Sequence, residues 1–508
     1  MSQRSHARGR RPQARCGTTA VRPRPGRRPV DDTPYFLSCT CELPGRQPVR
    51  PQRTLTTLAV VALLAVGCSD RGGSEDKTTA TDATAQAAAA VDFGDLKGLC
   101  GPGSPKSAPA QGVTASEIKV GVISDVGFTK ISDFPDAAKV FTAWCNDAGG
   151  INGRKLVATT RDTKLMEVRQ RMIEACRDDF ALVGGGAAMD ALGVRDRLSC
   201  LLPDFPAQVS QSENDGSSLQ VNTQARSASY ATYAGYYSWL VKEAYPASAG
   251  ALGIINGDAP VTKTLGAKTV ETLKAAGGTV TYDDLYPAAG VSDWTPYAQS
   301  IKSKNVKGLV FYGQFGQLAK LEQALTSLNY KLDWIDANNN AYNQQFLQLA
   351  GNQVLSAQNN LADLSGMYPL EQAASNPATQ QVVDLFAKYA PGTQVSLPAL
   401  RAFSAWLIFA KAAKSCGDNL TRKCVYDATA QEKAWTGGGL QAPVDASGAD
   451  TPVKCFNVER ATPDGWKPAD FKPTQGAYRC DAPAYKLTGK YTTAVTLLDV
   501  GKSQDDLK

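Results

Sequence analysis

Short apolar runs and amphipathic stretches alternate through most of this 508-residue chain. Residues 118–124 form an apolar run that ends in Ser124, which is typical of a buried parallel strand. Residues 134–147 place apolar side chains at three- and four-residue spacing, which predicts a helix with one buried face. The segment GGINGR at 149–154 then ends the helix, because glycine and Asn-Gly pairs suit left-handed turns. Residues 155–160 predict a second strand, parallel to the first since a helix lies between them.

The same alternation recurs in two arrays, which predicts two α/β lobes. In the first array, strands are expected at 118–124, 155–160, 180–183 and 200–202, and helices at 134–147, 167–177 and 189–198. A long helix is expected at 228–244. In the second array, strands are expected at 251–255, 279–283, 308–312 and 334–336, and helices at 263–275, 296–304, 317–328 and 343–349. An apolar helix at 397–415, late strands at 453–458 and 478–480, and a frayed tail from Gly501 complete the prediction.

Four stretches of the chain resemble one family. They are IKVGVISDVG, FTAWCNDAGGINGRKLVATTRD, FALVGGGAAMD and VSDWTPYAQSIKSKNVKGLVFYGQFGQL, within residues 113–445. Together they resemble the leucine/isoleucine/valine-binding proteins, the type I periplasmic solute-binding proteins of ABC transporters. The resemblance implies two doubly wound, Rossmann-like lobes joined by a hinge, with a ligand cleft between them. It places residues 113–225 and about 361–435 in one lobe, and residues 226–360 and about 436–490 in the other, with 491–508 as a tail.

The basic balance of the chain lies in its first 67 residues. The chain carries a formal charge of +6, but residues 1–67 hold twelve Arg, no Lys and three acids, so the remainder is slightly acidic. Net charge therefore gives no argument for a nucleic-acid partner. Residues 54–66 are uncharged and follow Arg53, which predicts a signal peptide.

The predicted signal peptide ends beside Cys68, in a context that resembles a bacterial lipobox. Cys68 is therefore the predicted lipidation site, which would anchor the protein to the outer face of the cytoplasmic membrane; an ordinary signal peptide with a chance cysteine is the alternative. Residues 69–91 lack bulky side chains, and residues 68–112 are expected to form a flexible spacer. We also expect the native protein to begin near Val49, because residues 1–48 are Arg- and Pro-rich without periodicity.

Eight cysteines follow Cys68, an even number that favours disulfides in an exported chain. In a doubly wound sheet the second and third helices lie on one face, and the first helix lies on the other. This topology brings the ends of neighbouring helices together, while the late cysteines flank short local loops. The predicted pairs are Cys100–Cys145, Cys176–Cys200, Cys416–Cys424 and Cys455–Cys480. Metal ligation is the alternative and is disfavoured because the chain has no CxxC motif, so no metal and no cofactor are expected.

Candidate ligand-binding residues follow the strands, because open parallel sheets bind ligands at the carboxyl ends of their strands. The first lobe offers Ser124, Asp125, Phe128, Gly185, Gly186, Ala187, Asp204 and Phe205, and the second offers Asp258, Gln314, Phe315, Asn338 and Asn339. The glycines either bring backbone amides to a ligand or simply permit the turn, and the asparagines either bind a ligand or form a polar loop. The aromatic residues at 230–239 are more often packing than a ligand stripe.

The resemblance also indicates which solute is excluded. In the branched-chain amino-acid binders a hydroxyl and amides after the third strand hold the ligand carboxylate, and Ala188 stands at that hydroxyl position. A threonine after the fourth strand has no counterpart in residues 203–206. The acid that holds the ligand ammonium aligns with Asn338, and an aromatic aligns with Phe315. These departures imply a solute that is less charged than an aliphatic amino acid, and one that is larger or more aromatic would also fit them.

The only histidine is His6, in the leader, so the exported chain has no histidine base and no enzyme activity is expected. The sequence predicts a monomeric substrate-binding lipoprotein that captures a small solute and delivers it to the permease subunits of an ABC importer. The solute would be amino-acid-like, amide-like or less charged. Two alternatives are a ligand-sensing receptor of the same fold and an exported carboxylate-dependent hydrolase.

Overall fold

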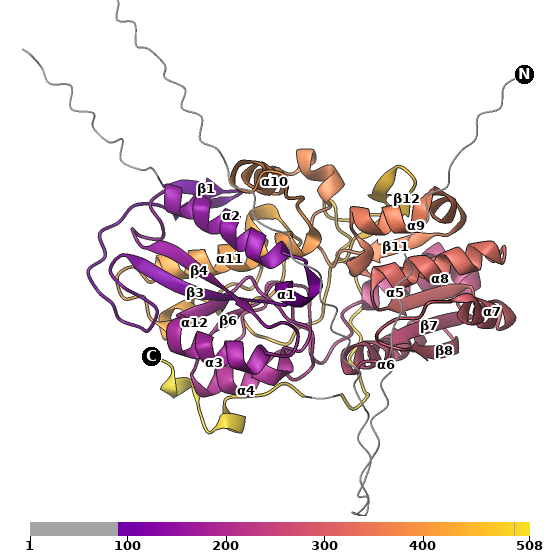
Figure 1. The fold of residues 1–508 in the computed structure, drawn as a ribbon, viewed down its shortest axis with the longest axis horizontal. Helices are drawn as coiled ribbons and strands as arrows, with labels where there is room; N and C mark the ends of the chain where they lie inside the picture. The colour runs from indigo at the N-terminus through magenta and orange to yellow at the C-terminus, as the bar shows by residue number, and fades with distance from the viewer. Residues whose placement is uncertain (1–89, 492) are drawn as a thin grey trace, which may run out of the picture. The chain divides into compact units, whose positions relative to one another are not determined.

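The computed structural model describes residues 90–491 and 493–508, and two large β-sheets organise them, beside a two-stranded hairpin (Figure 1). The first sheet has four parallel strands in the order β4-β3-β5-β6. They are β3 (Glu117–Ser124), β4 (Lys155–Asp162), β5 (Ala181–Val183) and β6 (Asp204–Phe205). This order is the doubly wound arrangement that the alternation of strands and helices predicted.

Helices cover both faces of the first sheet because neighbouring residues of its strands point to opposite sides. Val122 of β3 joins the core beneath α2 and α11, whereas Ile123 packs with α3. The Phe141 ring stacks on Trp406 with 5.3 Å between centroids, which joins α2 to α11. The helices of this layer are α1 (Val126–Thr129), α2 (Asp133–Asp147), α3 (Val168–Asp178), α4 (Ala191–Ser199), α10 (Pro377–Tyr389), α11 (Leu397–Ser415) and α12 (Arg422–Thr429).

The second sheet has seven strands in the order β13-β12-β11-β10-β9-β7-β8. Its first five strands along the chain are parallel, and β12 and β13 extend the sheet in antiparallel pairing. They are β7 (Leu252–Gly257), β8 (Val280–Tyr286), β9 (Gly308–Tyr312), β10 (Trp334–Asp336), β11 (Asn360–Asp363), β12 (Val458–Thr462) and β13 (Gly465–Pro468).

The two faces of the second sheet also take different helices. Val310 and Tyr312 pack with the aromatic residues of α5, whereas Leu309 and Phe311 join the core beneath α7, α8 and α9. The helices are α5 (Ala234–Trp239), which continues into a π-helical turn at Leu240–Ala244, α6 (Pro260–Ala275), α7 (Thr295–Ser303), α8 (Phe315–Ser327) and α9 (Gln344–Ala357). Short 3₁₀ turns lie at Pro246–Ser248, Asn339–Ala341, Leu370–Ser375 and Gly437–Gly439.

Several predicted elements differ from those in the structure. The strand expected at 200–202 forms at Asp204–Phe205 instead, because Cys200 still caps α4 and Leu201 takes a left-handed turn (φ 58°). The helix expected from residue 228 begins only at Ala234. The late strand expected at 453–458 begins at Val458, and residues 478–480 form only isolated bridges.

The predicted spacer ends earlier than expected, which is a correction. Residues Val91–Phe93 (β1) and Leu96–Cys100 (β2) pair as an antiparallel hairpin. The Phe93 side chain is fully buried and meets the rings of Trp144 and Phe403 at 6.0 and 6.2 Å between centroids. The small-residue composition before residue 91 does not extend into this hairpin. Residues 101–112 of the predicted spacer are described as well, and the amides of Lys106 and Ser107 donate to Asp418 Oδ1. The leader, the signal peptide, Cys68 and spacer residues 69–89 lie outside the described residues.

The C-terminal tail is not frayed, which is a second correction. Val495, Leu497 and Leu507 are buried and share a cluster with Val194 and Leu198 of α4. Two 3₁₀ turns, Leu498–Val500 and Gln504–Asp506, connect these buried side chains. The tail therefore packs on the first α/β layer although its sequence is mostly polar.

One predicted domain boundary falls inside a strand. Residues 360–363 form β11, which pairs with β10 of the second sheet, and the boundary expected at about residue 361 stays a prediction. The other expected boundaries remain predictions. None of the helices in the described part of the chain combines the length and apolarity needed to cross a membrane.

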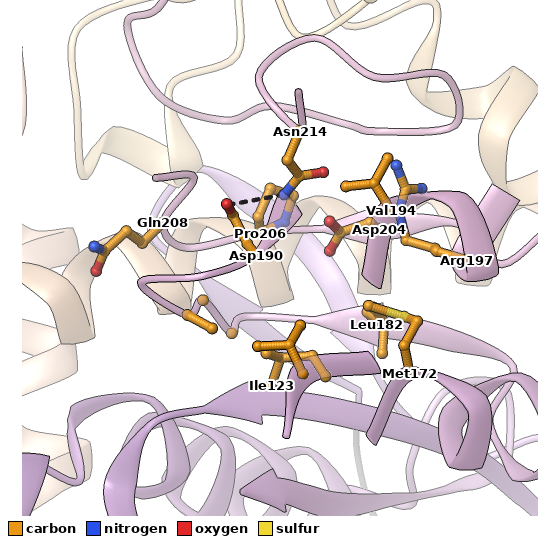
Figure 2. Close-up of a pocket in the computed structure, with 14 residues that line it drawn as sticks. Ile123, Met172, Leu182, Asp190, Val194, Arg197, Asp204, Pro206, Gln208 and Asn214 are labelled. Carbon is orange, nitrogen blue, oxygen red and sulfur yellow. Dashed lines mark hydrogen bonds between the residues drawn. The ribbon is translucent and has the colours of Figure 1, made fainter. Parts of the chain in front are cut away.

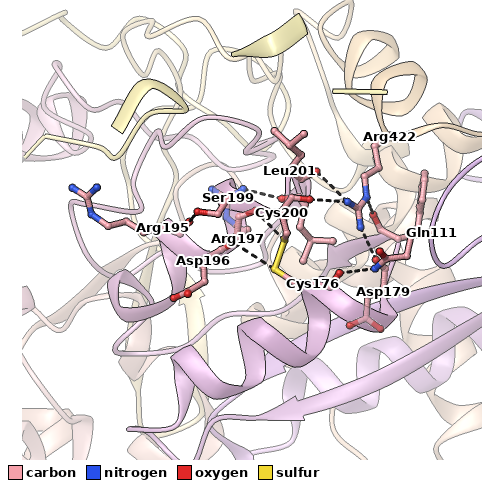
Figure 3. Close-up of a disulfide and its surroundings, with 12 residues drawn as sticks. Gln111, Cys176, Asp179, Arg195, Asp196, Arg197, Ser199, Cys200, Leu201 and Arg422 are labelled. Atoms are coloured by element: carbon pink, nitrogen blue, oxygen red, sulfur yellow. Dashed lines mark hydrogen bonds between the residues drawn. A yellow bond between two sulfur atoms is a disulfide. The ribbon is translucent and has the colours of Figure 1, made fainter. Parts of the chain in front are cut away.

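All four predicted disulfides are present: Cys100–Cys145, Cys176–Cys200, Cys416–Cys424 and Cys455–Cys480. Figure 3 shows the Cys176–Cys200 bond between the ends of α3 and α4, beside Arg422. The Arg422 guanidinium donates to the carbonyl oxygens of Asp179, Phe180 and Cys200 at 2.8–2.9 Å, and its burial lowers its pKa to about 10. The disulfide and Arg422 thus fix the same corner of the first layer.

Candidate functional site

The carboxyl ends of β3 and β5 hold the first group of predicted residues, and their polar groups bind one another. Asp125 is largely buried, and its carboxylate accepts hydrogen bonds from Ala188 N at 2.7 Å, from Leu165 N at 3.2 Å and from the Thr163 hydroxyl. The buried residue Ser124 accepts from Thr163 N through its carbonyl. Asp125 therefore ties together the loops after three strands.

The glycines after β5 serve close packing of loops. The Gly186 amide donates to the Ile123 carbonyl at 2.8 Å. A side chain at Gly185 would meet the Ile123 oxygen at 2.5 Å, and one at Gly186 would meet the Gln208 side chain at 2.7 Å. Of the two expectations for these glycines, this geometry favours the one in which they permit the turn.

A first hollow lies inside the first layer, between the sheet and α3 and α4 (Figure 2). Its free volume is about 20 Å³, which is room for about one water and not for a solute. The Asp190 carboxylate faces this space and accepts from Ser210 N, Gln211 N and Asn214 Nδ2 at 2.8–3.0 Å, while burial raises its pKa to about 6. Among the predicted residues, the hollow is lined by Gly185, Gly186, Ala187 and Asp204.

The remaining predicted residues of the first layer have other surroundings. Burial raises the pKa of Asp204, and the nearby Arg197 guanidinium opposes this shift. Phe205 is core, with its ring 5.4 Å from that of Phe409. Phe128 is 57% exposed on the short helix after β3. The structure therefore brings Ser124, Asp125 and the glycines together but sets Phe205 and Phe128 apart from them.

The second layer divides its predicted residues between three strand ends. Asp258 follows β7, is half exposed and pairs with Lys263. Gln314 and Phe315 begin α8 after β9. Asn338 and Asn339 follow β10 and line a second hollow together with Tyr233, Tyr236, Asp336 and Asp363.

This second hollow, lined by Tyr233, Tyr236, Asp336, Asn338, Asn339 and Asp363, is the candidate site. It lies at the carboxyl ends of β10 and β11, where open α/β sheets bind ligands. Asp336 accepts from the Tyr237 hydroxyl at 2.8 Å and from Asn338 N at 3.0 Å. Asp363 accepts from Ser365 N at 2.8 Å through Oδ1. Burial raises the pKa of Asp336 to about 6 and that of Asp363 to about 7.

A chain of hydroxyl groups supports Asp336 from behind. The Tyr237 hydroxyl lies 3.1 Å from that of Tyr312, which lies 2.8 Å from Thr269 Oγ1 on α6. Tyr237 is 1% exposed, so its interpretation as packing holds, although the same helix also supplies Tyr233 and Tyr236 to the hollow. Because Tyr237 holds one carboxylate oxygen in place, Asp336 is a fixed acceptor at the strand end.

The sequence prediction missed Asp336 and Asp363. Both end short apolar strands, and an acid at that position was a usable signal. The prediction took its candidates from the loop two residues after Asp336, at Asn338, and did not place a strand at 360–363.

The comparisons with known proteins agree with this architecture. The model of the periplasmic binding protein family matches residues 117–465, so the chain belongs to that family. No curated protein matches the sequence.

Solved structures show the type I periplasmic binding protein fold. A fatty acid ABC transporter substrate-binding protein from Thermomonospora curvata is 18% identical, with 75% of this chain and 95% of that chain covered and a TM-score of 0.58. A possible leucine/isoleucine/valine-binding protein from Rhodopirellula baltica SH 1 is 13% identical, with 72% and 98% covered and a TM-score of 0.59. A leucine-binding protein from Thermotoga maritima MSB8 is 14% identical, with 69% and 97% covered and a TM-score of 0.57.

Proposed function

We propose that this protein is the substrate-binding lipoprotein of an ABC importer, which captures a small solute outside the cytoplasmic membrane. The supporting observation is the candidate site itself, where two buried carboxyl groups and two tyrosines meet at the strand ends of a periplasmic binding protein. Two lobes would capture the solute by closing about a hinge around these strand ends, and the permease subunits would then receive it. Cys68 supplies the anchor that keeps the receptor beside them.

The proposal is tested by native mass spectrometry of the purified protein together with solution scattering across a panel of metabolites. We expect at least one solute to bind in one-to-one ratio, to remain chemically unchanged, and to reduce the radius of gyration. A sensor of the same fold would close in the same way, so copurification of permease subunits separates the two functions. Turnover of a bound solute would contradict the proposal and favour the hydrolase alternative.

Leucine is expected not to bind tightly. The Ala188 amide, which would meet a ligand carboxylate in the leucine binders, already donates to Asp125 at 2.7 Å. The side chain of Ala188 offers no hydroxyl, and Asn338 carries no charge for an ammonium group. Calorimetric titration should therefore detect no binding of leucine at micromolar concentrations. A micromolar Kd for leucine would overturn this prediction.

The anchor is tested by the substitution Cys68→Ser. A serine cannot accept the thioether-linked lipid, so this variant should leave the membrane fraction and appear in the soluble exported fraction. Ser74→Ala changes a small spacer residue six positions after Cys68 and serves as the control, which should stay on the membrane. Retention of the Cys68→Ser variant on membranes would exclude the lipid anchor.

A further inference from the structure

We infer that the C-terminal segment, residues 481–491 with 493–508, is a strap that joins the two α/β layers and limits how far they move about their hinge. In the described part of the chain, the backbone passes between the layers after β6, after β11 and after α12. The strap adds a fourth connection to these three. The inference rests on the hinge that the proposed function requires, and it can be tested without a solute.

The first half of the strap is held by α6 of the second layer. The Glu271 carboxylate accepts hydrogen bonds from Gly489 N at 3.1 Å and from the Tyr491 hydroxyl at 2.7 Å. It also accepts from the Thr488 hydroxyl at 2.8 Å. The Lys268 ammonium lies 5.4 Å from the centre of the Tyr491 ring, which is within the range of a cation–π contact. Because hydrogen bonds to an ionised acceptor are stronger than neutral ones, these contacts fix the segment on α6.

The second half of the strap is held by α4 of the first layer. Leu497 and Leu507 are buried in one cluster with Val194 of this helix. The Arg195 guanidinium of the same helix donates to the Asp499 carbonyl at 2.9 Å. Apolar burial and a polar contact therefore bind this half to a different layer from the first half.

The strap also runs along the connection after β6, which comprises residues 206–233. Backbone hydrogen bonds of 2.8–2.9 Å join the two segments: Ala231 N to the Tyr485 carbonyl, Leu487 N to the Ser229 carbonyl and Val495 N to the Glu213 carbonyl. As the strap advances, its partners move back along the connection, so the two segments are antiparallel. Hinge motion is absorbed by a few connecting residues that change their backbone dihedrals, and hydrogen bonds to a second segment restrict such changes.

The strap is short between its two anchors. Tyr491, which is bound by Glu271, stands four positions before Val495, which is bound by Glu213. Because an extended chain advances by at most ~3.6 Å per residue, the Cα atoms of Tyr491 and Val495 lie no more than about 14 Å apart in any conformation. A hinge motion that separates α6 from residue 213 beyond this reach must break one anchor. Both anchors are intact in the structure, so the strap bounds the motion.

The test lengthens the strap and leaves its anchors in place. Six Gly and Ser residues inserted between Thr493 and Ala494 raise the reach to about 36 Å, at ~3.6 Å per residue. The control places the same insertion after Gly392, in an exposed turn of the first layer. Lengthening an existing loop costs little stability, and a tail that only added buried surface would be insensitive to the first insertion.

The readout is the distribution of distances between two spin labels, one on each layer. The labels are attached to a ketone-bearing amino acid placed at Lys139 of α2 and Lys320 of α8, two exposed positions, so that no cysteine is disturbed. Pulsed electron resonance of the solute-free full chain should show a broader distribution that reaches longer distances when the strap is lengthened. The insertion after Gly392 should leave the distribution unchanged. Identical distributions in the wild type and the lengthened strap would overturn the inference.

A second variant releases the first anchor instead. Glu271→Ala removes the carboxylate that holds residues 488–491 and should broaden the distribution in the same direction. Lys274→Ala, which changes an exposed residue of the same helix, is the matched control and should have no effect. If the lengthened strap does not fold, the comparison of these two variants decides. Unchanged distributions in a protein that still closes on a solute overturn the inference alone, whereas a broadened distribution in a protein that no solute closes overturns the proposed function alone.

Discussion

The substitution Leu497→Ala should lower the free energy of unfolding by about 3 kcal/mol, because truncating a buried leucine costs about 2–5 kcal/mol. Leu497 is 5% exposed and packs with Val194 and Leu198 of α4. Its neighbour Leu498 is 82% exposed, so the chain supplies its own matched control. Leu498→Ala should change the free energy of unfolding by less than about 0.5 kcal/mol.

Urea denaturation followed by tryptophan fluorescence measures both effects. The tail is also held by polar contacts: Val495 exchanges hydrogen bonds with Glu213 and Ser218, and the Arg195 guanidinium donates to the Asp499 carbonyl. If Leu497→Ala releases the tail without unfolding the rest, limited proteolysis should cut the variant after residue 491 and spare Leu498→Ala. Equal stability and equal protease resistance of the two variants would show that the tail does not dock.

The tail also shows where sequence reasoning stops. Leu497 and Leu507 stand ten residues apart in a polar segment, so no helical or strand period links them. Their partners on α4 lie some 300 residues earlier in the chain, and nothing local reports that distance. The hairpin at residues 91–100 was missed for the same reason, since Phe93 is buried by Trp144 and Phe403.

Strands and helices that are marked by a local apolar run were predicted well. The strand at 308–312 and the helix at 397–415 agree with β9 and α11, because each is a continuous apolar segment with clear ends. Two of the disulfides, Cys100–Cys145 and Cys176–Cys200, followed from strand order, since a doubly wound sheet dictates which helix ends are neighbours. The other two, Cys416–Cys424 and Cys455–Cys480, followed from the local loops that their cysteines flank.

The candidate site was predicted only in part, because a polar residue at a strand end can serve either the protein or a ligand. Asp125 was expected to meet a ligand, yet its carboxylate is used by Ala188 N and Leu165 N. Asp363, at an equivalent place on β11, keeps one oxygen without a described partner. Whether such a carboxylate is used inside the protein depends on which loops from elsewhere in the fold pack against it. The residue type at the strand end does not indicate which loops these are.

The second prediction concerns pH, and its direction follows from four buried acids. Burial raises the pKa of Asp190 and Asp336 to about 6, of Asp363 to about 7 and of Glu322 to about 8. In the unfolded chain these groups ionise near their ordinary values of 3.8 and 4.5. The folded protein therefore holds protons that the unfolded chain has released. The stability that these four acids contribute is fully present below their unfolded-state pKa values, and it is lost as the pH rises toward ~8.

Other acids, whose pKa values are lowered in the folded protein, make stability fall at low pH. Backbone hydrogen bonds from Ser107 and Lys106 hold the pKa of Asp418 at about 2. Burial alone would raise the pKa of Glu271, but hydrogen bonds from Thr488, Gly489 and Tyr491 lower it to about 2. These groups stabilise the fold above their ordinary values and lose that contribution as the pH falls toward ~2. The two sets together place maximal stability near pH ~4–5, with a fall of several kcal/mol toward pH ~8.

The substitution Glu322→Gln tests the raised set at one residue. Glu322 is fully buried on α8 and accepts from Asn360 Nδ2 at 2.9 Å, a bond that the glutamine oxygen preserves. Urea denaturation should show no gain in stability at pH ~4 and a gain of about 2–4 kcal/mol at pH ~8, because the variant removes the cost of ionising a buried acid. Glu271→Gln should do the opposite, with a loss at neutral pH that disappears toward pH ~2. A stability maximum that stays near neutral pH, unchanged by Glu322→Gln, would show that these acids remain ionised in the folded protein.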